Sequence, residues 1–416
     1  MNNNNINLEK FTSIFDLNNE QVKIRSQSLL DFNKKGFPSK KNEDWKFNDL
    51  NKIISSKIPN LKFFNSLISK KKDKNEIIKN ISKDLLENNY IISSNGIIVD
   101  VYLNYEDKNK FEIVREPTFL NTSLNSSLNS LNMALYLDYI KLIIKENYKF
   151  SKPILFINYT SSDIENTVLN QRFDIVMEKN SCMSILDFNL SKSNNNFYNI
   201  NNKFLLHEGS VLKNYKIDIN DNSNLFYSKT EIDLYKNSIS ENFILSKGSE
   251  FAKNDIECNL KENHSSAFVN GIVALDGLKQ HEIKSKINHS SEHTKSYQLV
   301  KCSLKDQSKA AYQGKIYVDS VAQKTNGYQL SKAILLNDGT EFNGKPELEI
   351  YADDVKCSHG SSSGNLDENK IFYLMTRGLS KNQAKKILID GFFLEVIEKI
   401  TDSGVKEIIK DLMNIK

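Results

Sequence analysis

The residues best suited to chemistry lie in one short segment, 353–360, which contains two carboxylates, a thiol and an imidazole. Residues two apart on an extended strand share a face, so Cys357 and His359 would point the same way. Thiolate and imidazole both bind iron or zinc well, and this spacing lets both reach one ion. A tetrahedral site needs four ligands, and no second Cys/His pair lies nearby in the sequence. A metal site here would therefore need ligands from elsewhere.

The same two side chains also fit a structural role, with Cys357 packed as a small apolar residue and His359 hydrogen-bonded at the junction to the next element. Cysteine-protease chemistry is a weaker alternative, because nothing identifies an orienting Asn or Asp. Asp353 and Asp354 would point to opposite faces of a strand. They therefore favour a turn over the acid pair of a β-helix polysaccharide enzyme.

Two further sets of metal-ligating residues are weaker candidates. His289 and His293 have the i, i+4 spacing of a helical metal pair, but with His281 they lie in a Lys- and Ser-rich stretch that reads as strand and turn. A solvated loop is the favoured interpretation. The other cysteines occupy alternating apolar positions that predict core packing: Cys182, Cys258 and Cys302.

The elements that would position residues 353–360 are short strands. No proline occurs between Pro153 and Pro346, which suits a continuous hydrogen-bonded sheet. Within this stretch apolar residues recur with a period of two, and no long helical pattern interrupts them, which excludes a βαβ architecture. Glycines spaced 23 residues apart (Gly248 to Gly271) and 25 apart (Gly314 to Gly339) favour a solenoidal β-helix modestly. A large β-sandwich stays open as the alternative.

Helical patterns occupy both ends of the chain. The spacing of apolar residues predicts helices over 17–33, 75–88 and 127–139, and a strand over 97–103. Near the C-terminus, Asp367 can cap a helix, and Ser380 with Gln383 forms a capping box for the next. We therefore expect a mixed, mainly helical region over 1–150, a β core over 151–362 and a helical region over 363–416.

Composition excludes several classes of function. The chain has 56 Lys and Arg against 52 Asp and Glu, a net charge of +4, which is too small an excess to imply nucleic-acid binding. The apolar runs are too short to span a membrane, and the first residues lack the pattern of a secretory signal. Four scattered cysteines without a CxxC motif predict a reducing, cytoplasmic location. No phosphate-binding loop of the GxxxxGK type is present.

A series of short motifs carries a more specific signal. They are Gly314-Lys315-Ile316, Ala322-Gln323-Lys324-Thr325, Lys345 to Ile350, Ala352 to Gly360, Arg377-Gly378 and Gly391-Phe392, with Gly36-Phe37-Pro38 and Glu43 to Phe47 near the start. These stretches resemble the SufB/SufD family of iron–sulfur cluster assembly proteins over nearly the whole chain. The form of the junction at residues 357–360 and the compact length resemble the SufD branch.

The resemblance implies a fold and a set of partners. The fold would be mainly β, a right-handed parallel β-helix core flanked by N-terminal and C-terminal helical regions. The chain would be a non-catalytic scaffold in a complex with SufB and the ATPase SufC, with sulfur supplied by a cysteine desulfurase system. No cofactor would be bound tightly by this chain alone.

The resemblance also assigns roles to residues. His359 matches the functional histidine of the family junction, so it would bind iron or a transient iron–sulfur cluster shared with SufB, with Cys357 as a second candidate. The strands over 348–352 and 355–359 carry this junction, and because unpaired strand edges favour strand-to-strand association, they would lie at or beside the SufB seam. The terminal helices would dock SufC through residues of the family motifs there: Phe372, Tyr373, Arg377, Gly378 and Ala384.

The sequence leaves two alternative functions open. A β-helix carbohydrate-active enzyme would need an exposed groove of aromatic residues, whereas the single Trp45 lies outside the β region. The second alternative is a purely structural brace for SufB, in which His359 is a packing residue. The sequence does not distinguish this role from that of a metal-binding scaffold.

Overall fold

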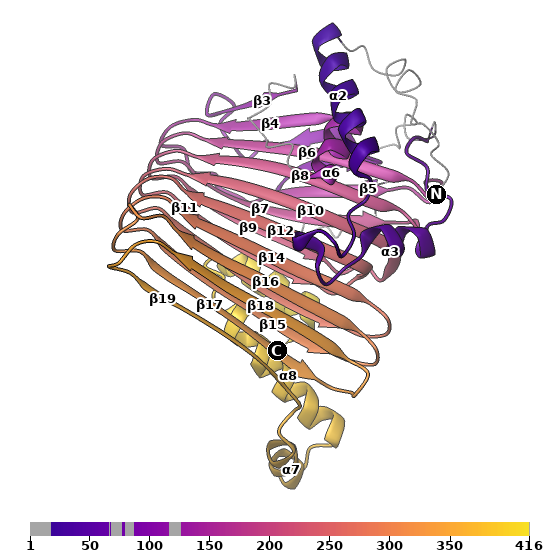
Figure 1. Ribbon diagram of the computed structural model, residues 1–416, viewed down its shortest axis with the longest axis vertical. Helices are drawn as coiled ribbons and strands as arrows, with labels where there is room; N and C mark the ends of the chain where they lie inside the picture. Colours follow the sequence, from indigo (N-terminus) through magenta and orange to yellow (C-terminus); the bar gives the residue numbers. More distant parts are fainter. Residues whose placement is uncertain (1–17, 66, 68–76, 80–86, 116–125, 416) are drawn as a thin grey trace. The chain divides into compact units, whose positions relative to one another are not determined.

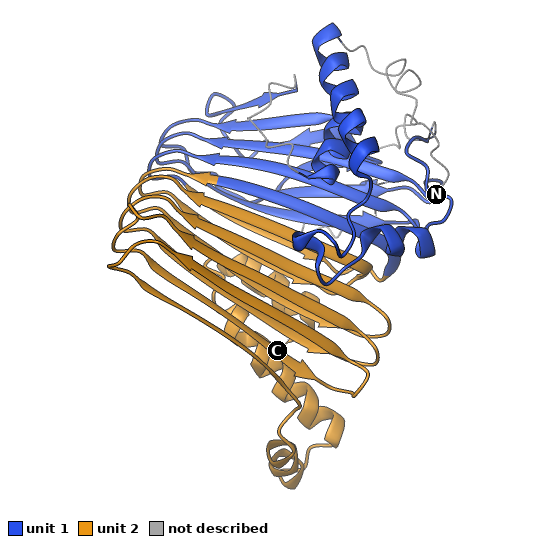
Figure 2. Cartoon of the chain, in the orientation of Figure 1, with its two compact units in different colours: residues 1–210, 222–232 blue, residues 211–221, 233–416 orange. Residues whose placement is uncertain are grey.

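The structure is a computed structural model that describes residues 18–65, 67, 77–79, 87–115 and 126–415. It is mainly β, with a parallel β-solenoid of about eight turns and with helices toward both termini (Figure 1). The predicted parallel β-helix is thus confirmed, and the parallel strand pairing excludes the β-sandwich. The chain divides into two compact units, 1–210 with 222–232 and 211–221 with 233–416 (Figure 2). The region boundaries expected after residues 150 and 362 stay predictions.

Each coil of the solenoid contributes one strand to each of two sheets. In unit 2, for example, β14 (Gln280–His289) pairs in parallel register with β12 (Ser249–Leu260) and with β16 (Lys309–Val318). Asn259 and Asn288, which are 29 residues apart, hydrogen-bond through their side chains at 2.7 Å. One coil is therefore about 29 residues long. The glycine spacing of 23 to 25 residues underestimates this length, because the glycines do not occupy equivalent positions: Gly248 precedes a strand, whereas Gly271 lies inside one.

Unit 1 contains the first coils and the N-terminal helices. Its strands form the orders β7-β5-β1-β2 and β10-β8-β6-β4-β3, with antiparallel pairing at the β1–β2 and β3–β4 ends. The helices are α2 (Asn19–Lys35), η1 (Glu43–Trp45), α3 (Leu50–Lys57) and α6 (Ser127–Leu135). The strands are β1 (Asn89–Ser94), β2 (Ile97–Tyr102), β3 (Phe111–Val114), β4 (Tyr139–Ile144), β5 (Ile154–Thr160), β6 (Val168–Met177), β7 (Cys182–Ser191), β8 (Phe197–Leu206) and β10 (Asn222–Leu234), whose last residues belong to unit 2.

Three of the four elements predicted near the N-terminus are present. The helix expected over 17–33 is α2, the strand over 97–103 is β2, and the helix over 127–139 is α6, which ends before β4 begins at Tyr139. Most of the helix expected over 75–88 lies outside the described residues. The buried guanidinium of Arg25 joins α2 to the end of α6 by donating to the carbonyl oxygens of Ala134 (3.2 Å) and Tyr136 (2.9 Å).

Unit 2 contains the last coils and the C-terminal helices. Its strand orders are β19-β17-β15-β13-β11-β9 and β18-β16-β14-β12. The remaining strands are β9 (Val211–Asp218), β11 (Ile239–Ser246), β13 (Ser266–Leu275), β15 (Lys295–Leu304), β17 (Asn326–Leu335), β18 (Glu341–Ile350) and β19 (Lys356–Gly364). The helices are α7 (Glu368–Thr376), α8 (Lys381–Ile397) and α9 (Ser403–Met413). Both predicted helix starts are confirmed, since Asp367 caps α7 and Ser380 with Gln383 forms the capping box of α8.

A buried lysine holds α8 against the sheet of unit 2. Lys301 on β15 donates to the carbonyl oxygen of Phe392 at 2.7 Å and pairs with the Glu395 carboxylate at 2.5 Å. Its ammonium also lies 4.4 Å from the centre of the Phe392 ring. Burial lowers the pKa of Lys301, while Glu395 opposes that shift. These contacts fix α8 on the face of β15 and leave α7 to extend beyond it (Figure 1).

All four cysteines are free, and burial raises the pKa of Cys258 and Cys302. Those two side chains are fully buried, which confirms that they pack in the core, whereas Cys182 is half-buried. Among the described helices, none is both long enough and apolar enough to cross a membrane.

Candidate functional site

Cys357 and His359 lie on β19, which is the last strand of its sheet. β19 pairs with β17 on one side, and the register places Cys357 beside Gly327 and His359 beside Gln329. Gly327 and Gln329 are buried because they face the interior of the coil. Paired residues of parallel strands share a face, so Cys357 and His359 continue the interior face of the solenoid. The predicted common face is therefore present.

The Cys357 side chain is half-buried against an apolar cluster. It packs against buried residues of the last two coils: Ile316, Val318, Ala322 and Ala352. Burial raises the pKa of the Cys357 thiol, while a hydrogen bond with the Gly327 backbone opposes that shift. The thiol is therefore mostly protonated at neutral pH, and a metal ion that binds the sulfur has to displace the proton.

His359 is exposed although it continues the interior face. Its neighbour Gln329 is 2% exposed and donates from Nε2 to the carbonyl oxygen of Glu347 at 3.0 Å. β19 ends the strand order, so no further strand covers the His359 ring in the described chain. Nothing in the described part of the chain hydrogen-bonds this imidazole, so the alternative of a histidine that holds the helix junction has no contact to support it. The ring is open to a ligand or to a partner.

The last coil offers two ligands on one face and no complete site. Within the ranges that the structure describes, no group of three or more His, Cys, Asp and Glu side chains could hold a metal ion. Asp353 and Asp354 form the predicted turn, in which Asp354 pairs with Lys324 and its N–H donates to Gln323 Oε1 at 2.9 Å. Remaining ligands for an ion at Cys357 and His359 would have to come from outside the described residues.

Two of the three histidines expected in a solvated loop are buried, so that prediction is wrong for them. His281 Nδ1 lies 2.8 Å from Ser246 Oγ, and His289 Nδ1 lies 2.7 Å from Thr294 Oγ1. Burial lowers the pKa of His281 to about 4 and that of His289 to about 3. Both rings are neutral interior groups, because a period of two places them on the inner face of β14. Only His293 lies in an exposed turn.

Four of the five residues predicted to bind a partner lie on α7 or directly after it. Phe372 is 67% exposed and Tyr373 is 56% exposed, whereas Ile371 points inward with 1% exposure. The guanidinium of Arg377 lies 5.2 Å from the centre of the Tyr373 ring. The left-handed φ of +93° at Gly378 ends the helix, a conformation that favours glycine.

Ala384, the fifth predicted partner-binding residue, is fully buried on α8. In this conformation it shapes the packing of its helix and does not reach the surface. Sequence reasoning also missed exposed apolar residues on or directly after the last strands: Tyr328, Ile350 and Tyr351 are 38%, 38% and 59% exposed. Tyr328 lies on the outward face of β17, between the inward-facing Gly327 and Gln329. Ile350 ends β18, the last strand of its sheet, and Tyr351 directly follows it.

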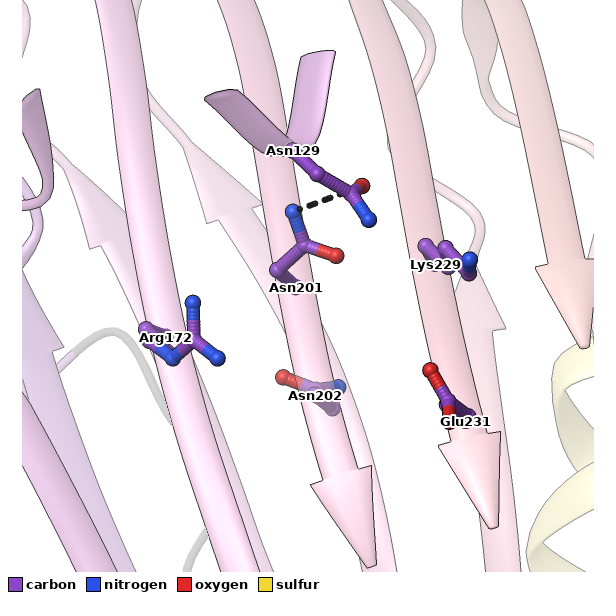
Figure 3. A pocket seen from close by; sticks show the side chains of 6 residues that line it. All are labelled: Asn129, Arg172, Asn201, Asn202, Lys229 and Glu231. Carbon is purple, nitrogen blue, oxygen red and sulfur yellow. Dashed lines mark hydrogen bonds between the residues drawn. The ribbon is translucent and has the colours of Figure 1, made fainter. Parts of the chain in front are cut away.

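A small polar cavity in unit 1 does not belong to this site. It is lined by Asn129, Arg172, Asn201, Asn202, Lys229 and Glu231 (Figure 3). Its volume is about 10 Å³, which is room for about one water molecule. Asn201 Nδ2 donates to Asn129 Oδ1 across it at 3.2 Å. The cavity is a polar seam between α6 and the strands and is too small for a substrate.

Comparison with known proteins gives the family. Residues 159–392 match the family model described as SUF system FeS cluster assembly, SufBD core domain. An iron–sulfur cluster assembly SufBD family protein of Synechocystis sp. is 27% identical over 288 residues, which are 67% of this chain and 64% of that protein, a little under two thirds. The iron–sulfur cluster assembly protein SufD of Escherichia coli is 22% identical over 397 residues, 93% of this chain and 90% of that protein. The chloroplastic protein ABCI7 of Arabidopsis thaliana is 25% identical over 408 residues, 92% and 84% of the two chains.

The family match covers more than half of the chain and includes β19 and the start of the C-terminal helices. It therefore covers the half-buried thiol and the exposed imidazole of the last coil. With its parallel β-solenoid and its match over residues 159–392, this chain belongs to the SufBD family of iron–sulfur cluster assembly proteins.

Proposed function

We propose that this chain is a SufD-type scaffold subunit that works with SufB and the ATPase SufC in iron–sulfur cluster formation. The observation that carries the proposal is the last coil, where Cys357 and His359 share the interior face and the other edge of β19 has no pairing strand in the described chain. An unpaired strand edge favours association with another strand. A β-strand of SufB added there would bring its own side chains beside His359.

The iron or nascent cluster is a cargo of the complex, shared between subunits. His359 supplies one ligand because its imidazole is exposed, and Cys357 supplies a second after losing its thiol proton. SufB supplies the others, since two ligands leave the coordination of iron or of a cluster incomplete. A cysteine desulfurase system supplies the sulfur. This chain itself catalyses no reaction.

SufC docks on the exposed apolar face of α7, which includes Phe372 and Tyr373. Phe372, Tyr373 and Met375 are all exposed on this one helix, and contiguous exposed apolar side chains mark interaction surfaces. The short link from β19 to α7 would transmit movement of the ATPase to the last coil. The complex would work in the cytoplasm, where the four free cysteines stay reduced.

The test is co-expression with SufB and SufC, followed by anaerobic reconstitution with iron and sulfide. We expect the three chains to elute together with a bound cluster, measured as iron and sulfide per complex. His359→Ala should leave the complex intact and lower its cluster content severalfold. His207→Ala, which changes a histidine of unit 1, is the matched control. An unchanged cluster content in His359→Ala would remove the ligand role and leave this chain as a structural brace for SufB.

The carbohydrate-enzyme alternative has lost its support. Trp45 is 4% exposed and its ring packs 5.5 Å from that of Tyr227, so it cannot stack on a sugar. Turnover of an acidic polysaccharide by the purified chain would revive this alternative.

A further inference from the structure

Two exposed histidines that the proposed function does not use lie face to face in unit 2. The ring centroids of His264 and His293 are 5.0 Å apart, and the ring planes differ by 17°. His264 lies in the turn between β12 and β13, and His293 lies in the turn between β14 and β15, one coil later. Both side chains are exposed. The solenoid therefore places two imidazoles side by side that are 29 positions apart in the sequence.

The backbone fixes this pairing. His264 and His293 have left-handed φ angles of 62° and 58°, which few residues other than glycine adopt. The His264 N–H donates to the carbonyl oxygen of Glu292 at 3.4 Å, which ties one turn to the next. Lys324, in the turn that follows, has the same conformation with a φ of 61°. Turns of successive coils thus stack in register, about one strand spacing (~4.8 Å) apart.

We propose that His264 and His293 together bind one borderline divalent metal ion, of the class of Ni²⁺, Cu²⁺ or Zn²⁺, through one ring nitrogen each. Imidazole nitrogen suits these ions, and water would complete the coordination. The nitrogens of stacked rings do not converge, so each ring has to turn about its Cβ–Cγ bond. That torsion is broad, and both side chains are exposed.

The two turns also carry carboxylates. Glu262 and Glu292 are exposed in the same turns as His264 and His293. Glu262 Oε2 accepts a hydrogen bond from the Lys236 N–H at 3.0 Å, which holds that carboxylate in place. The ammonium of Lys324, in the next turn, is paired with the carboxylate of Asp354.

The rigid pairing explains why two ligands would suffice for measurable binding. Once one imidazole holds the ion, the second is already close by, so its binding is an intramolecular step at high effective concentration. Loss of either ring removes this advantage entirely. Two histidines that bind one ion together therefore lose affinity differently on mutation from two histidines that each bind an ion weakly. Single and double variants can measure this difference.

The experiment titrates the full chain with Ni²⁺ by calorimetry. The background carries Cys357→Ser and His359→Ala, so the proposed cluster ligands do not compete and failure of the cluster proposal does not affect the result. We expect one bound Ni²⁺. His264→Asn and His293→Asn should each weaken binding by about tenfold or more, and the double variant should lose at most about twofold beyond either. Asn tolerates the left-handed backbone, so the variants keep the turn.

His207→Asn is the control and should leave the affinity unchanged. Thermal unfolding with and without Ni²⁺ gives a second measurement, since an ion that binds only the folded chain raises its Tm. That rise should disappear in both single variants. No Ni²⁺ uptake by the background chain, or single variants that bind within twofold of it, would overturn the proposal. Losses that simply add in the double variant would also overturn it, because they indicate two separate sites.

Discussion

His359 lies directly beside Gln329 in the parallel register of β17 and β19, yet Gln329 is buried and His359 is exposed. Both residues face the interior of the solenoid. The difference arises because a following strand covers Gln329 and none covers His359 in the described chain. The end of the solenoid thus presents an interior face to solvent or to a partner, and the first prediction concerns that face.

Association with SufB should protect the last strands from hydrogen exchange. The backbone amides of 348–352 and 355–359 should exchange more slowly when SufB is added, because an added strand pairs with the free edge of the last coil. β11, which is paired on both sides within its sheet, serves as the internal reference. Exchange in 348–359 that does not slow would contradict the placement of the seam.

Replacing Phe372 with Asp should weaken SufC binding at least tenfold, because it places a charge in the apolar docking face. The measurement is the affinity of the purified chain for SufC. Leu278→Asp is a matched control, since Leu278 is also 67% exposed but lies in the turn between β13 and β14. Equal affinities of the two variants would show that SufC docks elsewhere.

Gly314→Ala should destabilise the last coils. A Cβ at Gly314 would clash with Gln329 Oε1 and would lie 2.6 Å from the Tyr312 hydroxyl, and both of these side chains are buried. Overpacking of this kind costs about 1–3 kcal/mol, and displacement of Gln329 would disturb its neighbour His359. The free energy of unfolding from urea titration gives the measure.

Gly391→Ala is the control for Gly314→Ala. A Cβ at Gly391 meets no atom within 4 Å, and the residue lies inside α8. The substitution should stabilise the helix by up to about 1 kcal/mol. If both alanine variants shift the unfolding free energy in the same direction, the steric explanation of Gly314 is wrong.

His289 should make stability fall as the pH is lowered. Its pKa is about 3 in the folded chain against 6.5 as its ordinary value, so the ring stays neutral in the folded state while it gains a proton in the unfolded state. The contribution is complete above pH 6.5 and is lost as the pH falls. At pH 5 the loss should be about 2 kcal/mol relative to about pH 7.5.

The test compares the unfolding free energies of the original chain and His289→Gln at both pH values. The variant should lose about 2 kcal/mol less between them. Other buried groups, such as Asp218, whose pKa burial raises to about 6, act equally in both chains and cancel in the comparison. An equal slope in His289→Gln would mean that the histidine is protonated in the folded state.

The sequence alone determined the local structure of this protein. Alternation of apolar residues predicted the strands, because a strand has a period of two. The residue types at the helix starts predicted both C-terminal caps, Asp367 and Ser380, because each cap bonds only to residues three or fewer positions away. The shared face of Cys357 and His359 was predictable for the same reason, because it depends only on residues two positions apart on one strand. The family motifs predicted the solenoid more specifically than the glycine spacing did.

Only the tertiary structure decided which alternating residues are covered. His281 and His289 are buried, whereas His359 on an equivalent inward position is exposed, because coverage depends on the neighbouring coil about 29 residues away. The contact of His264 with His293 arises in the same way, from stacked turns. A sequence pattern reports which face a side chain occupies, but the physical environment of that face is set by residues a full coil away.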